Sequence, residues 1–105
     1  GWSNATGDAD YGLYALFHSS QHGEAGNRSF YTNAKVDELL DTGRREADQA
    51  VREAIYKEAM QLLTDDAPMA FVLHPAVLTG VANNVTGFYV TSDNMYHLKD
   101  VKITE

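Results

Sequence analysis

The spacing of apolar residues predicts two short helices early in the chain. The first is predicted over 11–19, where the apolar residues fall on one helix face at i, i+3 and i+4: Leu13, Leu16 and Phe17. Asp8 or Asp10 can cap its N-terminus. The second is predicted over 34–44, after the N-cap residue Asn33, and its inward-facing residues are Val36, Leu39 and Leu40. Gly43 is expected to weaken the end of the second helix.

The strongest helical pattern covers 49–64, and Asp48 is its expected N-cap. Its apolar positions recur with a period of 3.6 residues and predict this buried stripe: Val51, Ile55, Ala59, Leu62 and Leu63. Polar residues are expected on the opposite side, among them Arg52, Glu53, Lys57 and Glu58. Pro68 disfavours helical geometry in the residue before it and ends this region.

The remainder of the chain predicts strands. The continuous apolar run 69–73 is typical of a strand covered on both faces. Further strands are predicted over 77–82, 85–91 and 98–104, with a possible bulge at Gly87. Helices followed by strands predict an α+β fold class: three helices, then a small mostly antiparallel or mixed sheet.

The charge and residue composition exclude several classes of binding partner and reaction. Eight Lys and Arg stand against fifteen Asp and Glu, for a formal net charge of −7 at pH 7. This acidic balance and the lack of a basic stripe argue against nucleic acid and against binding to a membrane surface. The absence of cysteine excludes disulfides, thiol catalysis and zinc–thiolate sites. With no glycine-rich phosphate loop and no nucleophile elbow, the sequence calls for no cofactor.

One candidate for chemistry is a metal site. Asp8 and Asp10 could direct two carboxylates at a hard cation, and His18 and His22 are spaced i, i+4 as zinc ligands on a helix are. A metal-dependent hydrolase using these four residues is therefore one alternative. Ser19 stands where an HExxH motif has glutamate, so helix capping and surface histidines are the simpler interpretation.

Several short segments, taken in order, resemble the C-terminal part of the large solute-binding proteins of bacterial ABC importers, family 5. The residues that carry the resemblance are Gly1-Trp2, Gly7 to Asp10, Leu16-Phe17, Asn27 to Tyr31, Asn33, Val36 to Leu40, Ile55 to Ala59, Asp66 to Pro68, His74, Asn84 to Phe88 and Leu98 to Val101. The resemblance covers essentially the whole chain and implies a fragment of a two-lobed periplasmic-binding-protein fold. Residues 1–105 would form a single fragment, with about 1–75 in one lobe and about 76–105 returning as strands through the hinge.

The resemblance implies a binding protein rather than an enzyme. It would capture a peptide or peptide-like solute and deliver it to a membrane permease, as a periplasmic protein or cell-surface lipoprotein. Peptide-binding members hold the ligand's ammonium with an aspartate three residues after the tryptophan, where this chain has Ala5. The opening pattern is closest to that of the glutathione-binding members. A purely structural or assembly role for the fragment is the remaining alternative.

The resemblance also places the opening loop in the wall of the ligand cleft. Trp2 would supply apolar surface, although a core tryptophan is an equal alternative. Hydrogen bonds to the ligand are expected from Ser3, Asn4 and Thr6. A ligand cation could meet Asp8 or Asp10, and Arg28 could pair with a ligand carboxylate.

Overall fold

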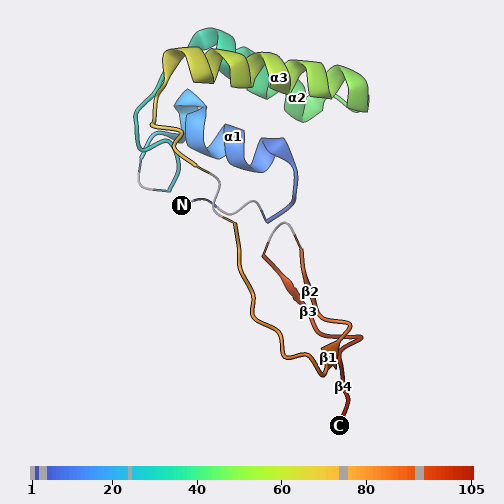
Figure 1. Cartoon of the computed structure of the whole chain (residues 1–105). Helices are drawn as coiled ribbons and strands as arrows, with labels where there is room; N and C mark the ends of the chain where they lie inside the picture. The colour runs from blue at the N-terminus through green and yellow to red at the C-terminus, as the bar shows by residue number, and fades with distance from the viewer. Residues whose placement is uncertain (1, 3–4, 24, 74–75, 92–93) are drawn as a thin grey trace. The chain divides into compact units, whose positions relative to one another are not determined.

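The computed structural model describes residues 2, 5–23, 25–73, 76–91 and 94–105. The chain divides into two compact units, Gly1–Phe71 and Val72–Glu105 (Figure 1). The first unit is helical and the second contains short strands. The α+β class predicted from the sequence is confirmed, whereas the assignment of 1–75 and 76–105 to a lobe and a hinge stays a prediction.

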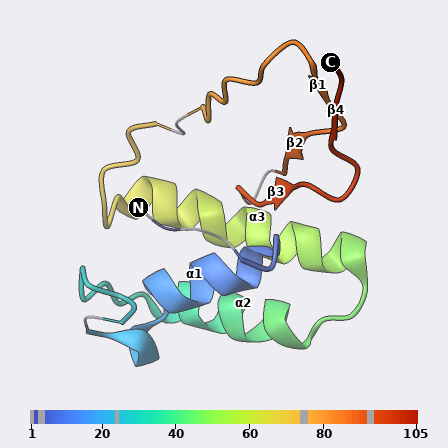
Figure 2. The same cartoon turned by 90° about the horizontal axis from the view of Figure 1, so that it is seen from below.

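The described part of the first unit forms three α-helices and one turn of 3₁₀ helix. In chain order these are α1 (Ala9–Phe17), η1 (Ser19–Gln21), α2 (Ala34–Arg45) and α3 (Gln49–Asp66). Helices α2 and α3 form an antiparallel pair, and α1 packs against that pair (Figure 2). The unit is therefore a pair of antiparallel helices with a third, short helix packed alongside it.

Polar caps fix where the three helices begin. The Asp8 side chain accepts a hydrogen bond from the Asp10 amide at 2.8 Å, so Asp8 rather than Asp10 is the N-cap of α1. The predicted caps of α2 and α3 are confirmed: Asn33 accepts from the amides of Lys35 and Val36, and Asp48 accepts from the Val51 amide.

The core lies where the three helices meet. Its buried residues are Phe17, Val36, Leu39, Leu40, Tyr56, Ala59 and Leu63. The inward positions predicted for the first two helices are confirmed, with Leu13 and Leu16 packed against this core. A Cβ on Gly43 would lie 2.8 Å from the Tyr56 ring, so glycine allows α2 to approach that ring. Gly43 thus allows close helix packing and does not end the helix, because α2 continues to Arg45.

The predicted inner face of α3 is wrong at its N-terminal end. Val51 is 49% exposed, and the buried residues of α3 are instead Tyr56, Ala59 and Leu63. The helix is turned so that the aromatic ring of Tyr56 faces α2. This rotation brings Arg52, which was expected on the outer side, to within hydrogen-bonding distance of both α1 and α2.

In its described residues the second unit has two antiparallel pairs of very short strands. β1 (Val85–Thr86) pairs with β4 (Lys102–Ile103), so that Val85 lies opposite Ile103. β2 (Tyr89–Val90) pairs with β3 (Tyr96–His97), with Tyr89 opposite His97. Gly87 separates β1 from β2 with a φ of +77°, and a Cβ there would collide with the Asp100 carbonyl oxygen. The single strand expected over 85–91 is thus broken in two.

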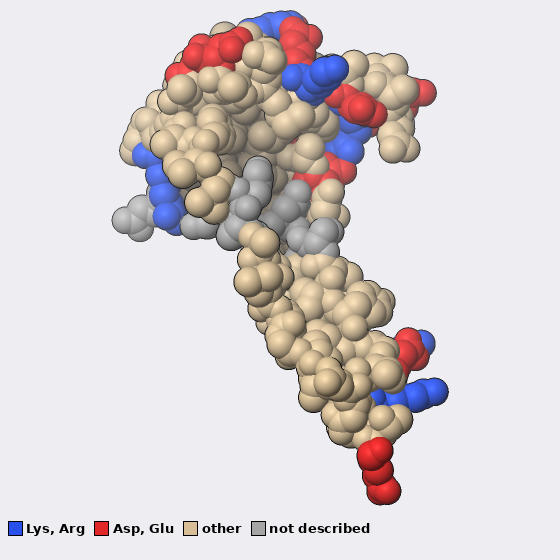
Figure 3. Space-filling model, viewed as in Figure 1, with Lys and Arg blue, Asp and Glu red and all other residues tan. Residues whose placement is uncertain are grey.

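The strands predicted over 69–73 and 77–82 do not form among the described residues, which leave out His74 and Pro75. Val72 is 79% exposed and Leu78 is 94% exposed. Few charged side chains appear along the part of the chain after Phe71 in Figure 3. An apolar run becomes a doubly covered strand only when neighbouring strands and helices cover it, and the described residues provide no such partner.

The corrected face of α3 predicts opposite outcomes for two similar substitutions in the full-length protein. Ala59→Asp should lower the free energy of unfolding by about 3 kcal/mol or more, because it places an unpaired charge in the core. Val51→Asp should change it by less than about 0.5 kcal/mol, since Val51 is a surface position. Urea titration followed by circular dichroism measures both, and equal destabilisation by the two variants would contradict this helix orientation.

Candidate functional site

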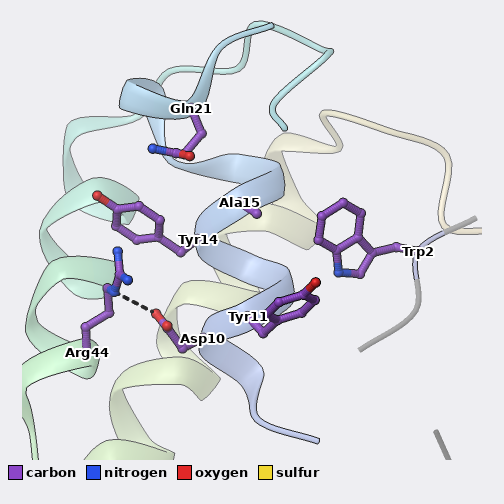
Figure 4. Close-up of a pocket in the computed structure, with 7 residues that line it drawn as sticks. All are labelled: Trp2, Asp10, Tyr11, Tyr14, Ala15, Gln21 and Arg44. Carbon is purple, nitrogen blue, oxygen red and sulfur yellow. Dashed lines mark ion pairs between the residues drawn. The ribbon is translucent and has the colours of Figure 1, made fainter. Parts of the chain in front are cut away.

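A cavity of about 480 Å³ lies beside α1 in the helical unit (Figure 4). Its walls are formed by Trp2, Asp10, Tyr11, Tyr14, Ala15, Gln21 and Arg44. Helix α1 contributes most of these side chains, from the side opposite its partly buried Leu13 and Leu16. One short helix therefore completes the core with one face and lines the cavity with the other.

Trp2 forms an aromatic wall of the cavity. Its ring lies with its centroid 5.8 Å from that of Tyr11, at an interplanar angle of 40°. Gly12 adjoins the indole, and a Cβ at that position would lie 3.4 Å from the Trp2 Nε1 atom, in ordinary van der Waals contact. The Trp2 side chain is 44% exposed, so it is not a core tryptophan of the helical unit. Its position suits contact with the apolar or planar part of a ligand.

The polar wall is built around Arg44, in the last turn of α2. Its Nε atom lies 3.2 Å from Asp10 Oδ1, and its guanidinium carbon lies 3.9 Å from the centroid of the Tyr14 ring. The Tyr56 hydroxyl also donates to Asp10 Oδ1 at 3.4 Å. Asp10 and Tyr14 thus hold the Arg44 guanidinium at the edge of the cavity.

The Asp8 carboxylate is bound by Arg52 within the helical unit. Arg52 donates from Nη1 and Nη2 to its two carboxylate oxygens at 2.5 and 2.6 Å, and from Nε to the Gly43 carbonyl oxygen at 3.0 Å. Hydrogen bonds from Arg52 and from the Asp10 amide lower the pKa of Asp8 below its ordinary value. Burial and the charge of Asp10 raise the pKa of Tyr56. Asp8 is therefore a structural anion, joined to α3 as well as capping α1.

The other residues predicted for the ligand site are placed as follows. Ser3 and Asn4 lie outside the described residues. Thr6 Oγ1 accepts a hydrogen bond from the Asp8 amide at 3.3 Å, in the turn before α1. Arg28 is an exposed residue of the loop between η1 and α2, and it is not part of the cavity lining. Of the predicted residues that the structure describes, the cavity brings together Trp2 and Asp10.

Five residues of the cavity lining were not predicted from the sequence: Tyr11, Tyr14, Ala15, Gln21 and Arg44. Part of the signal was present, because Asp10 and Tyr14 are four residues apart on a helix, and Tyr11 lies between them. Arg44 had no such local signal. Its pairing with Asp10 depends on how α1 and α2 pack.

The residues of the proposed metal site do not converge. The helix ends at Phe17, so His18 and His22 do not share a helical face. Nδ1 of His18 accepts from the Ser20 amide at 3.1 Å, whereas Nε2 of His22 lies 2.9 Å from the Tyr31 carbonyl oxygen. Among the described residues, no group of three or more His, Cys, Asp or Glu side chains could hold a metal ion. The geometry gives the hydrolase alternative no support.

The lowered pKa of Asp8 predicts a pH-dependent contribution to stability. The charged carboxylate stabilises the fold above the unfolded-state value, and this contribution is lost as the pH falls through the lower folded-state pKa. Asp8→Asn keeps a good N-cap residue but removes the ion pair. It should therefore cost up to about 1 kcal/mol near neutral pH and flatten the loss of stability in acid.

Asp48→Asn is the matched control for this prediction. Asp48 also caps a helix through a backbone amide, but no salt bridge of Asp48 occurs within the described part of the chain. Urea titrations of both variants from acid to neutral pH separate capping from ion pairing. If both variants lose the same stability with the same pH dependence, Arg52 is not the cause.

Comparison with known proteins identifies the family, although no protein-family model matches the chain. The whole chain aligns at 34% identity over 106 residues with the glutathione-binding protein GsiB of Pectobacterium atrosepticum, covering 21% of that protein. For GsiB of Escherichia coli (strain K12) the identity is 29% over 98% of the chain and 20% of the relative. Protein XP55 of Streptomyces lividans is 44% identical over 67% of the chain and 13% of its own length. The chain thus spans about a fifth of the length of the GsiB relatives. It belongs, as a fragment, to the family 5 solute-binding proteins of ABC importers.

Proposed function

We propose that the protein carrying this chain is the extracytoplasmic binding component of an ABC importer, and that it captures a peptide-like solute for a membrane permease. Support comes from the alignment of the whole chain with proteins named for glutathione binding. In this proposal the chain binds its solute without transforming it. No helix in the described ranges combines the length and the apolar character needed to cross a membrane.

The observation that carries the proposal is the aromatic cavity next to the opening segment. The resemblance predicts that this segment lines the ligand cleft, and the prediction is supported by the presence of Trp2 among the residues that line a cavity of about 480 Å³. Sites for small ligands commonly have volumes of about 300–1,000 Å³ and combine aromatic walls with a few polar groups. Trp2, Tyr11 and Tyr14 supply the aromatic rings here, and Asp10 and Arg44 supply the charged groups.

Glutathione is the first solute to test. Two of the relatives described above are named glutathione-binding proteins. The chain has Ala5 where the peptide-binding members of the family hold the ligand's ammonium, which argues against recognition of an ordinary free peptide by that contact. In a two-lobed protein, a solute that contacts both lobes favours the closed form through its higher affinity for that form.

Isothermal titration calorimetry on the full-length protein tests this proposal with glutathione and, in parallel, trialanine. Glutathione should give saturable binding, and Trp2→Ala should weaken it by more than about 1 kcal/mol by removing an aromatic anchor. Phe30→Ala is a matched control, because Phe30 is 65% exposed and does not line the cavity.

Two results would count against this function. If neither glutathione nor trialanine binds to the full-length protein, the proposed solute class is contradicted. Binding of glutathione with the same affinity in the wild type and in Trp2→Ala would remove Trp2 from the ligand site.

A further inference from the structure

Two neighbouring side chains hold the Arg44 guanidinium in place. Its Nε atom faces Asp10 Oδ1 at 3.2 Å, and the Tyr14 ring lies against the guanidinium at 3.9 Å from its central carbon (Figure 4). These two contacts restrict both the direction and the plane of the group. The side chain nevertheless remains 45% exposed, at the edge of the cavity.

The outer edge of the Arg44 guanidinium is available. Neither Nη1 nor Nη2 donates a hydrogen bond to any residue that the structure describes. Arg52 differs, because its Nη atoms bind Asp8 and its Nε atom binds the Gly43 carbonyl oxygen. Two parallel N–H donors on a planar group match the two oxygens of a carboxylate, an arrangement that lysine cannot reproduce.

Local geometry matters here because the chain as a whole repels anions. Its formal net charge is −7 at pH 7, so long-range attraction does not bring a carboxylate to this surface. Asp10 also offsets part of the positive charge of Arg44. What remains is a pair of oriented donors beside aromatic walls, and such donors discriminate a carboxylate from its ester by hydrogen bonding.

We propose that Arg44 binds a carboxylate group of the captured peptide-like solute through Nη1 and Nη2, with Asp10 as the positioning residue. This inference rests on the proposed function and adds to it a chemical requirement: the solute must carry a free carboxylate. Arg44 takes the role that the sequence suggested for Arg28. Trp2 and Tyr11, on another side of the cavity, contact the rest of the solute.

The test compares glutathione with its diethyl ester, in which both carboxylates are blocked, using calorimetry on the full-length protein. The wild type should prefer the acid by about tenfold or more, and Arg44→Gln should reduce that preference by about tenfold. Arg44→Lys should restore only part of it, because an ammonium group keeps the charge without the planar pair of donors.

Arg45→Gln is the matched control. Arg45 is the next residue of α2, its side chain is 79% exposed, and its ion pair with Asp41 is 3.9 Å long. It does not line the cavity, so Arg45→Gln should keep the preference for the acid. Circular dichroism melting curves establish that the variants fold. If Arg44→Gln does not fold, the preference for glutathione over its diethyl ester is compared between Arg44→Lys and the wild type instead.

The outcomes separate this inference from the function on which it rests. Binding of glutathione with the same preference for acid over ester in Arg44→Gln and the wild type would overturn the role of Arg44 alone. An equal fall in preference in Arg45→Gln would also overturn it, since the effect would then be one of general charge. If neither glutathione nor trialanine binds to the wild type, the proposed function fails, and this inference fails with it.

Discussion

One guanidinium group links all three α-helices of the helical unit. Arg52 projects from α3, donates to the Gly43 carbonyl oxygen in α2, and binds both carboxylate oxygens of Asp8 at the start of α1. It therefore connects all three helices at one point. Gly43 packs closely against the ring of Tyr56, which lies one turn after Arg52 in α3. This close packing brings the Gly43 carbonyl oxygen within reach of Arg52. An arginine suits this position because its planar guanidinium carries N–H donors that point in several directions, so that it can bind partners on two helices at once.

The joint at Arg52 also positions the cavity. Once the first turn of α1 is fixed against the last turn of α2, Asp10 lies beside Arg44, and the Tyr14 ring covers the guanidinium. The same helix contributes Phe17 to the buried core. Because core packing and cavity lining share a helix of only nine residues, a shift of α1 would disturb both. The proposed ligand wall is thus supported by the same contacts that stabilise the fold.

Local sequence signals predicted what local interactions determine. The N-caps Asn33 and Asp48 and the inward positions of the first two helices followed from short-range patterns. Features that depend on distant partners were not predicted. Val51 and Tyr56 offered α3 two possible inner faces, and packing against α2 selected the face with Tyr56. Likewise, the apolar run 69–73 has strand character but no strand partner in the described residues, and no local signal links Arg44 to Asp10.

The central claim is that the cavity beside Trp2 is a wall of the solute site in the full-length protein. A crystal structure of that protein with glutathione is the most direct measurement. The account predicts glutathione in contact with the Trp2 ring, with one of its carboxylates within hydrogen-bonding distance of Arg44. Glutathione bound elsewhere, with the cavity filled by another segment of the same protein, would contradict it.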